Sequence, residues 1–179
     1  LHRTPDEIGD INVKRLVQVF GESTIRIFNA VMKHQRILFI GYNHSAADVA
    51  QLVLSTVALV APPMTGVIQR TYPYANLTDL EFLQVDGYIA GVTNPMFGQH
   101  GEWWDLCCVL DLPNNVGYVY TPEEKKAEDA MGLASGVHIA PRLNLSTPQS
   151  QMDNKFIISV LSGIDHYLDE YWVRQQFFD

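Results

Sequence analysis

The side chains that could perform chemistry in this chain are six histidines, two cysteines and 20 aspartates or glutamates. Metal sites need histidines or cysteines at set spacings, and the sequence contains no H-x-x-x-H pair and no C-x-x-C pair. It also lacks the G-x-S-x-G turn that presents the nucleophile of many serine hydrolases. Cys107 and Cys108 are adjacent in a β-prone segment, where successive side chains point to opposite faces, so at least one is expected in the core. The sequence therefore predicts no catalytic residue, no metal and no cofactor.

Two weaker signals for a polar site remain. The turn from Gly41 to Ser45 leads into a predicted helix, where an anion could bind, but nucleotide-binding loops need more glycines and a lysine. We interpret it as a plain strand-to-helix turn capped by Ser45. Near the C-terminus, 165–170 could gather carboxylates and an imidazole, and we interpret this group as the solvated face of a helix. Because nucleotide-binding and catalytic motifs are missing, an enzyme with a flavodoxin-like fold is only a distant alternative. The absorbance of a bound flavin or nucleotide would reveal such an enzyme.

Composition excludes several partner classes. The 179 residues carry a formal net charge of −8, with a pI near 5.1. Phosphate binding rests on clustered Lys and Arg, so nucleic acid is not an expected partner, and direct binding to anionic lipid is disfavoured. Two cysteines make no disulfide framework, and the longest apolar stretch, 46–64, is interrupted by polar residues and two prolines. We predict a cytoplasmic protein that reaches membranes or the cell cortex only through a partner.

The hydrophobic pattern predicts an α/β fold in which a mostly parallel central sheet is sandwiched by helices, with a C-terminal helix. The expected helices span 11–34 with a break at Gly21, 45–60 capped by Ser45 with Asp48 in its first turn, and 77–84. The expected strands span 36–41, 66–71, 88–93, 103–112 and 116–120, the last two as a hairpin. This alternation predicts right-handed crossovers between parallel strands.

The ends of the chain are expected to lie outside this domain. Residues 1–10 are interpreted as a linker, 11–120 as the domain, and 121–150 as a flexible insertion or linker with little periodicity. The clearest amphipathic pattern predicts one long helix over 151–177. Because the sequence begins with Leu1 rather than Met, we expect an excised or processed piece of a larger protein.

About half of the chain resembles a known family. Residues 21–112 resemble the central lobe of a DENN domain, most closely the subgroup called the stabilisation-of-polarity-axis (SPA) domain. The resemblance rests on Ile27–Ile40, on the helix ending at Pro62-Pro63, on Tyr72-Pro73-Tyr74, on Gly87–Phe97 and on Trp104-Asp105-Leu106. The Gly-Tyr-Ile-Ala-Gly-x-Thr-Asn-Pro-x-Phe segment is the strongest of these signals.

The resemblance implies a fold and an activity. DENN domains have a longin-like first lobe, a central α/β lobe and a helical tail, and many are guanine-nucleotide exchange factors for Rab GTPases in vesicle traffic. SPA-type members are linked to polarised growth and to docking an Arf-family GTPase. Residues 11–120 would be the central lobe and 151–179 the first helix of the tail, while the longin-like lobe and further tail helices would belong to the rest of the parent protein. Exchange uses a surface shared between the lobes, so this piece alone could be inactive.

An exchange factor acts by binding and not by covalent chemistry, so it needs an anchoring surface. We predict that surface at the carboxyl ends of the strands, where α/β sheets present their binding loops. Its candidate partner-binding residues are Tyr42, His44, Tyr72, Tyr74, Asn94, Met96 and Phe97. An equally weighted alternative for the last loop is that Pro95 and Phe97 lock it against the core.

Two functions from different classes follow. The first is a regulator of a Rab- or Arf-family small GTPase. The second is a non-catalytic scaffold of the same fold. A nucleotide-release assay on a panel of GTPases separates them.

Overall fold

The computed structural model describes residues 11–111, 114–130, 147–166 and 168–178. Its helices are α1 (Val13–Phe20), α2 (Thr24–Met32), α3 (Ala46–Ala58), α4 (Met96–Gln99), α5 (Pro122–Ala130), α6 (Pro148–Asp165) and α7 (Glu170–Phe178). Its strands are β1 (Ile37–Gly41), β2 (Thr71–Tyr72), β3 (Ile89–Val92), β4 (Leu106–Asp111) and β5 (Val116–Tyr120). Short 3₁₀ turns are η2 (Gly21–Ser23), η3 (Ile68–Arg70) and η4 (Glu81–Gln84).

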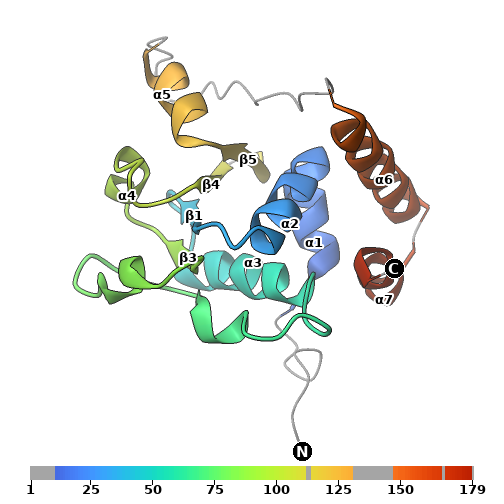
Figure 1. Ribbon diagram of the computed structural model, residues 1–179, viewed down its shortest axis with the longest axis horizontal. Coiled ribbons are helices and arrows are strands. Elements are labelled where there is room, and N and C mark those ends of the chain that lie inside the picture. Colours follow the sequence, from blue (N-terminus) through green and yellow to red (C-terminus); the bar gives the residue numbers. More distant parts are fainter. Residues whose placement is uncertain (1–10, 112–113, 131–146, 167, 179) are drawn as a thin grey trace, which may run out of the picture.

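The strands form one sheet in the order β2-β3-β1-β4-β5. The first four strands of that order are parallel, with Ile37 of β1 paired to Ile89 of β3 on one side and to Leu106 of β4 on the other. β4 and β5 form the predicted antiparallel hairpin. The predicted fold class, a mostly parallel sheet between helices, is confirmed (Figure 1).

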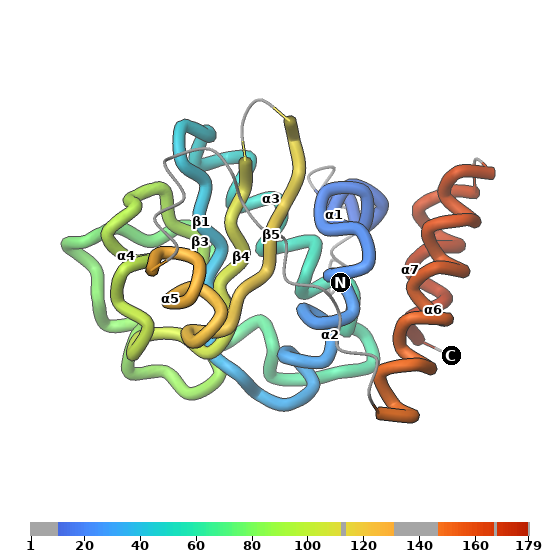
Figure 2. Tube along the Cα trace, turned by 90° about the horizontal axis from the view of Figure 1, so that it is seen from above, coloured from blue at the N-terminus to red at the C-terminus, as the bar shows by residue number. Residues whose placement is uncertain are grey.

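The sheet separates two hydrophobic cores. β1 is buried along its whole length, as its continuous apolar run predicts, and its side chains alternate between the two faces. Ile37 and Phe39 join the core formed with α1, α2 and α3, while Leu38 and Ile40 join the core on the opposite face. Figure 2 shows α4 and α5 on one side of the strands, and α1 and α2 on the other, with α6 and α7 beyond them.

The predicted break at Gly21 is confirmed. Gly21 has a positive φ of 52°, a conformation that favours glycine, and its N–H donates to the carbonyl of Val17 as α1 ends. α2 resumes at Thr24 after one 3₁₀ turn. The two helices can therefore each turn an apolar face to the same side of the sheet.

The prediction of one helix over 151–177 was wrong, because the segment forms two helices. α6 ends at Asp165, and Asp169 accepts a hydrogen bond from the N–H of Trp172 (2.9 Å) as α7 starts. The helices pack closely, since any side chain on Gly163 would meet the Trp172 ring. The apolar stripe belongs to both helices, which bury Ile157, Val160, Ile164, Val173 and Phe177 in the core shared with α1 and α2.

The interpretation of 121–150 as flexible was wrong for its first part. Residues 122–130 form α5, which begins with a reciprocal cap: Glu124 accepts from the N–H of Thr121 (2.7 Å) and the Thr121 hydroxyl accepts from the N–H of Glu124 (3.3 Å). Arg26 of α2 also binds Glu124, at 2.6 Å. The linkers expected at 1–10 and within 131–146 lie outside the described residues.

Two elements on the β2 side are shorter than predicted. The strand expected at 66–71 is the η3 turn followed by the two residues of β2, and the helix expected at 77–84 is the single turn η4. Asn76 forms a local turn before η4, in which its side chain accepts from the N–H of Thr78 (2.9 Å), and η4 itself has no side-chain cap. Of the helices in the described ranges, none is both long enough and apolar enough to cross a bilayer.

Candidate protein-binding rim

Four parallel strands bring their carboxyl ends to one edge of the sheet. We call this edge the carboxyl rim and define it by the residues that follow the strands: Tyr42–His44 after β1, Pro73-Tyr74 after β2 and Thr93–Met96 after β3. These segments contain most of the residues predicted to bind a partner. The structure places those residues in three different settings.

Tyr74 and Met96 are the large exposed side chains of the rim, and the partly buried Asn94 fixes the loop that carries Met96. The hydroxyls of Tyr74 and Thr93 are 3.4 Å apart, which links the ends of β2 and β3. The Asn94 side chain accepts from the N–H of Met96 (2.9 Å), so the loop enters α4 in a fixed turn. Tyr74 is 45% exposed and Met96 is 43% exposed. The structure therefore presents two large side chains to solvent on adjacent, ordered segments.

Gly91 allows this arrangement. Its carbonyl accepts from the N–H of Ala75 (2.8 Å), and a Cβ atom at Gly91 would collide with the carbonyl oxygen of Pro73. The segment that carries Tyr74 thus lies directly on the backbone of β3. Only a residue without a side chain permits that close approach.

Phe97 and Tyr72 face inward. Phe97 is fully buried and packs on Phe82 and Trp103, with ring centroids 6.1 and 5.6 Å apart. The Phe97 carbonyl accepts from the indole N–H of Trp104 (3.1 Å). Tyr72 is partly buried against Phe82, at a centroid distance of 5.7 Å. The loop is therefore locked against the core, as the alternative interpretation held, and Phe97 cannot meet a partner in this conformation.

Tyr42 and His44, on the turn after β1, are both partly buried. A Cβ atom at Gly98 would lie 3.1 Å from the Tyr42 hydroxyl, so that hydroxyl faces α4. Burial raises the pKa of Tyr42, and its phenol is further influenced by Cys107 and by charged residues of α5. His44 is half-buried, and its Nε2 atom has no hydrogen-bond partner among the described residues.

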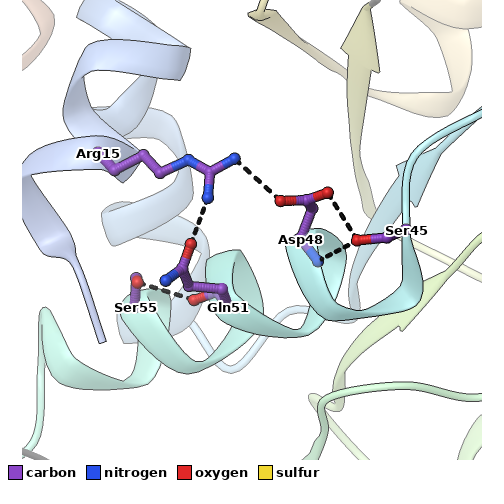
Figure 3. Close-up of polar contacts among 5 residues, drawn as sticks. All are labelled: Arg15, Ser45, Asp48, Gln51 and Ser55. Atoms are coloured by element: carbon purple, nitrogen blue, oxygen red, sulfur yellow. Dashed lines mark hydrogen bonds and ion pairs between the residues drawn. The ribbon is translucent and has the colours of Figure 1, made fainter. Parts of the chain in front are cut away.

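Polar contacts between α1 and α3 fix the end of the β1 turn (Figure 3). The Ser45 hydroxyl accepts from the N–H of Asp48 (3.1 Å) and donates to its carboxylate (2.6 Å), as the predicted cap requires. Arg15 of α1 binds the same carboxylate at 3.2 Å and also donates to Gln51. The Ser45 hydrogen bond, with help from Arg15, lowers the pKa of Asp48. A carboxylate already occupies this helix N-terminus, which argues against an anion site there.

A polar cleft of about 440 Å³ lies between α4 and α5. Its walls include Trp104 and charges of both signs, among them Glu102, Lys125, Lys126 and Asp129. Lys125 is paired with Asp129 at 2.6 Å and with Glu128 at 3.4 Å. The cleft therefore holds charges of both signs, and its Lys125 is neutralised by the two carboxylates.

The cysteines and the buried tyrosines are inert. Cys107 and Cys108 are both fully buried, one in each core, and burial raises the pKa of Cys107 to about 12. Burial also raises the pKa of Tyr88, whose hydroxyl donates to the Trp103 carbonyl at 2.6 Å. No group of His, Cys, Asp and Glu side chains suited to a metal ion occurs in the described part of the chain.

Two interactions that anchor the domain were missed from the sequence. Glu170, which we had interpreted as part of a solvated face, accepts from the N–H groups of Val13 and Lys14 at 2.7 Å each. Arg36 and Asp105 pair at the starts of β1 and β4, with Nη2 2.7 Å from Oδ1 and Nε 3.1 Å from Oδ2. Both Arg36 and Asp105 lie in segments that carried the family resemblance, and that resemblance was the sequence feature that could have indicated their importance.

Comparison with known families decides the affiliation of this domain. The family model described as stabilization of polarity axis matches residues 11–115, more than half of the chain. The chain belongs to the SPA family. The matched region runs from before α1 to the residue before β5, so the SPA region contains the carboxyl rim and ends before β5 and α5.

A curated relative supports the SPA assignment. The AFI1-like protein C776.06c of Schizosaccharomyces pombe is 30% identical over 126 residues. The match covers 60% of this chain and 20% of that protein. This SPA chain therefore corresponds to about one fifth of its relative.

The expectation of a DENN domain was wrong. The family that matches is SPA, and SPA is a separate family. The sheet is therefore not a DENN central lobe, and the helices after it are not a DENN helical tail. The SPA part of the resemblance and its link to cell polarity stand.

Proposed function

We propose that this SPA chain is the binding module of a cell-polarity protein and that its carboxyl rim docks an Arf-family small GTPase. The observation that carries the proposal is the joint exposure of Tyr74 and Met96 on ordered segments at the ends of β2 and β3. Aromatic and methionine side chains are enriched at the centres of protein interfaces. The choice of GTPase rests on the SPA-type resemblance described above.

The chemistry of the described residues supports binding over catalysis. The two thiols are buried, and Lys125 of the polar cleft is paired with Asp129 and Glu128. The net charge of −8 disfavours direct attraction to anionic lipid. We therefore propose that the protein is cytoplasmic and reaches the cell cortex through its protein partner.

Binding to immobilised GTPases tests the proposal. Members of the Rab and Arf families, each loaded with GDP, loaded with a GTP analogue or stripped of nucleotide, are presented to the 179-residue chain. Met96→Ala and Tyr74→Ala should each weaken binding about tenfold, as expected for residues near an interface centre. Nucleotide release measured in parallel separates a regulator from a scaffold, since a scaffold binds without changing the release rate.

The chain offers a matched control for each variant. Met152 of α6 and Tyr171 of α7 are 58% and 75% exposed, and both helices lie on the opposite side of the domain from α4 (Figure 2). Met152→Ala and Tyr171→Ala should leave the affinity within twofold. Absence of binding to every GTPase, or equal losses in rim and control variants, would overturn the proposal.

A further inference from the structure

The surface around the ends of β2 and β3 carries charge of one sign. Residues 61–99 contain four charged side chains: Arg70, Asp79, Glu81 and Asp86. The three carboxylates are exposed, whereas Arg70 is only 5% exposed. The Arg70 guanidinium donates to the carbonyls of Gly87 and Val31, so it is committed to the interior. The exposed charges of this segment are therefore all negative, and the lysines nearest to α4, Lys125 and Lys126, line the cleft beside Gly98 and Gln99.

Large exposed apolar side chains lie on the same group of segments, which Phe82 joins by packing on Tyr72 and Phe97. Tyr74, Leu80 and Met96 are 45%, 38% and 43% exposed. Asp79 and Leu80 belong to a compact turn, in which the N–H of Asp79 donates to the Asn76 carbonyl (3.1 Å) and the Leu80 carbonyl accepts from Leu83 (3.1 Å). Figures 1 and 2 both place the β2–β3 connection and α4 on the side of the domain away from α6 and α7. We call Tyr74, Asp79, Leu80, Glu81 and Met96 the acidic apolar surface.

We infer that the acidic apolar surface binds a protein segment whose apolar side chains are flanked by lysine or arginine. Opposite charges around an apolar centre speed association and exclude partners of the wrong sign. Nucleic acid and anionic lipid both carry the wrong sign for this surface. The inference rests on the proposed function for the roles of Tyr74 and Met96, and adds the charge that their partner must carry.

A designed peptide tests the inference without any GTPase. The probe is a fluorescein-labelled peptide with leucine and phenylalanine anchors flanked by lysines, and its comparison peptide carries glutamate at every lysine position. Binding to the 179-residue chain is measured by fluorescence polarisation at about 50 mM and about 300 mM salt, because screening shortens the reach of surface charges. The lysine peptide should bind, more weakly at the higher salt, and the glutamate peptide should not.

Charge reversal separates this surface from the net charge of the chain. The double variant Asp79→Lys/Glu81→Lys should weaken binding of the lysine peptide about tenfold. The control Glu22→Lys/Asp165→Lys reverses two exposed carboxylates elsewhere, changes the net charge equally and should change affinity less than twofold. Circular dichroism confirms that each variant remains folded. Equal losses in the two double variants would overturn the inference, since only net charge would then matter.

Chemical-shift mapping gives a second readout. Addition of the lysine peptide should shift the amide signals of Tyr74, Leu80 and Met96 and leave those of α6 and α7 unmoved. Shifts centred elsewhere would overturn the inference even if the peptide binds. A GTPase that binds the rim while the lysine peptide fails would leave the proposed function standing and refute the charge requirement. Binding of the lysine peptide without binding of any GTPase would support the charge requirement and refute the proposed function.

Discussion

The carboxylate of Glu170 accepts a hydrogen bond from the backbone N–H of Val13 at 2.7 Å, across 157 positions of sequence. Its second oxygen accepts from the N–H of Lys14, also at 2.7 Å. The first turn of a helix has N–H groups without partners in the helix and the positive end of its dipole, so a carboxylate there is stabilising. α7 thus supplies part of the N-terminal cap of α1 and fastens the C-terminal helix pair to the domain.

Replacing Glu170 with alanine should lower the free energy of unfolding by about 1–2 kcal/mol, the usual range for loss of a helix cap. Urea unfolding followed by circular dichroism measures the change. Trp172 lies between α6 and α7 and reports separately, by its fluorescence, on whether the helix pair loosens. Asp165→Ala, which removes an exposed carboxylate at the end of α6, should change stability by less than about 0.5 kcal/mol. Equal losses in the two variants would refute the capping role.

The Arg36–Asp105 pair should make stability depend on acid pH. Its hydrogen bonds to Arg36 lower the pKa of Asp105 below the ordinary value. A carboxyl group with a lowered folded pKa stabilises the fold above its unfolded pKa of about 3.9, and this stability is lost as pH falls through the folded value. Because both side chains are about one third exposed, we expect a contribution of about 1 kcal/mol.

Asp105→Asn tests this expectation in unfolding experiments between about pH 7 and pH 2. The variant should be less stable than the parent near neutral pH and should lose less stability on acidification. Asp48 has a lowered pKa for a similar reason. Asp48→Asn should therefore also reduce the loss of folding stability on acidification. An unchanged pH profile in Asp105→Asn would show that the pair does not couple folding to protons.

The two cysteines should not react in the folded protein. Both are free and fully buried, and burial raises the pKa of Cys107 to about 12 and that of Cys108 well above its usual value. The thiolate is the reactive form, so at pH 8 neither should be alkylated by iodoacetamide. Mass spectrometry should show no adduct on the native chain and two adducts in urea. Rapid modification of either cysteine without denaturant would contradict the buried placement.

Arg26 should hold α5 in place. It donates to the Val119 carbonyl of β5 (2.8 Å) and to Glu124 of α5 (2.6 Å), and α5 has no buried residue of its own. Arg26→Met should therefore accelerate trypsin cleavage at Lys125 and Lys126 several-fold, because cleavage requires local opening.

Arg15→Met is the matched control for that experiment, since the hydrogen bonds of the Arg15 guanidinium join α1 to α3 (Figure 3). It should leave the cleavage rate at α5 unchanged. If Arg26→Met is cleaved no faster than the parent, α5 is held by other contacts.

The features that were predictable from the sequence depend on residues close together in the chain. The buried run of β1, the break at Gly21 and the Ser45 cap each follow from a few adjacent side chains. α5 was missed because it has no apolar stripe, although Thr121 and Glu124 carry the capping-box signal with a proline after the threonine. The apolar stripe that runs through α6 and α7 hid the break between them.

The candidate site was only partly predictable for a related reason. The ends of the strands could be located, so Tyr42, His44, Tyr74, Asn94 and Met96 lie after strands as expected, while their role in binding a partner stays a prediction. Which aromatic side chain turns inward depends on partners from other segments, and Phe97 is buried because Phe82 and Trp103 enclose it. Glu170 was unpredictable for the same reason, since its partners lie at the other end of the chain.

The hydrogen bond from Arg26 to Val119 also bears on how the protein behaves at high concentration. β5 is the last strand of the sheet, and an edge strand offers its free backbone groups to any strand of another molecule. A guanidinium on one of those carbonyls places a bulky charge in the path of an incoming strand. The same arginine that holds α5 should therefore keep neighbouring copies of the sheet from joining edge to edge.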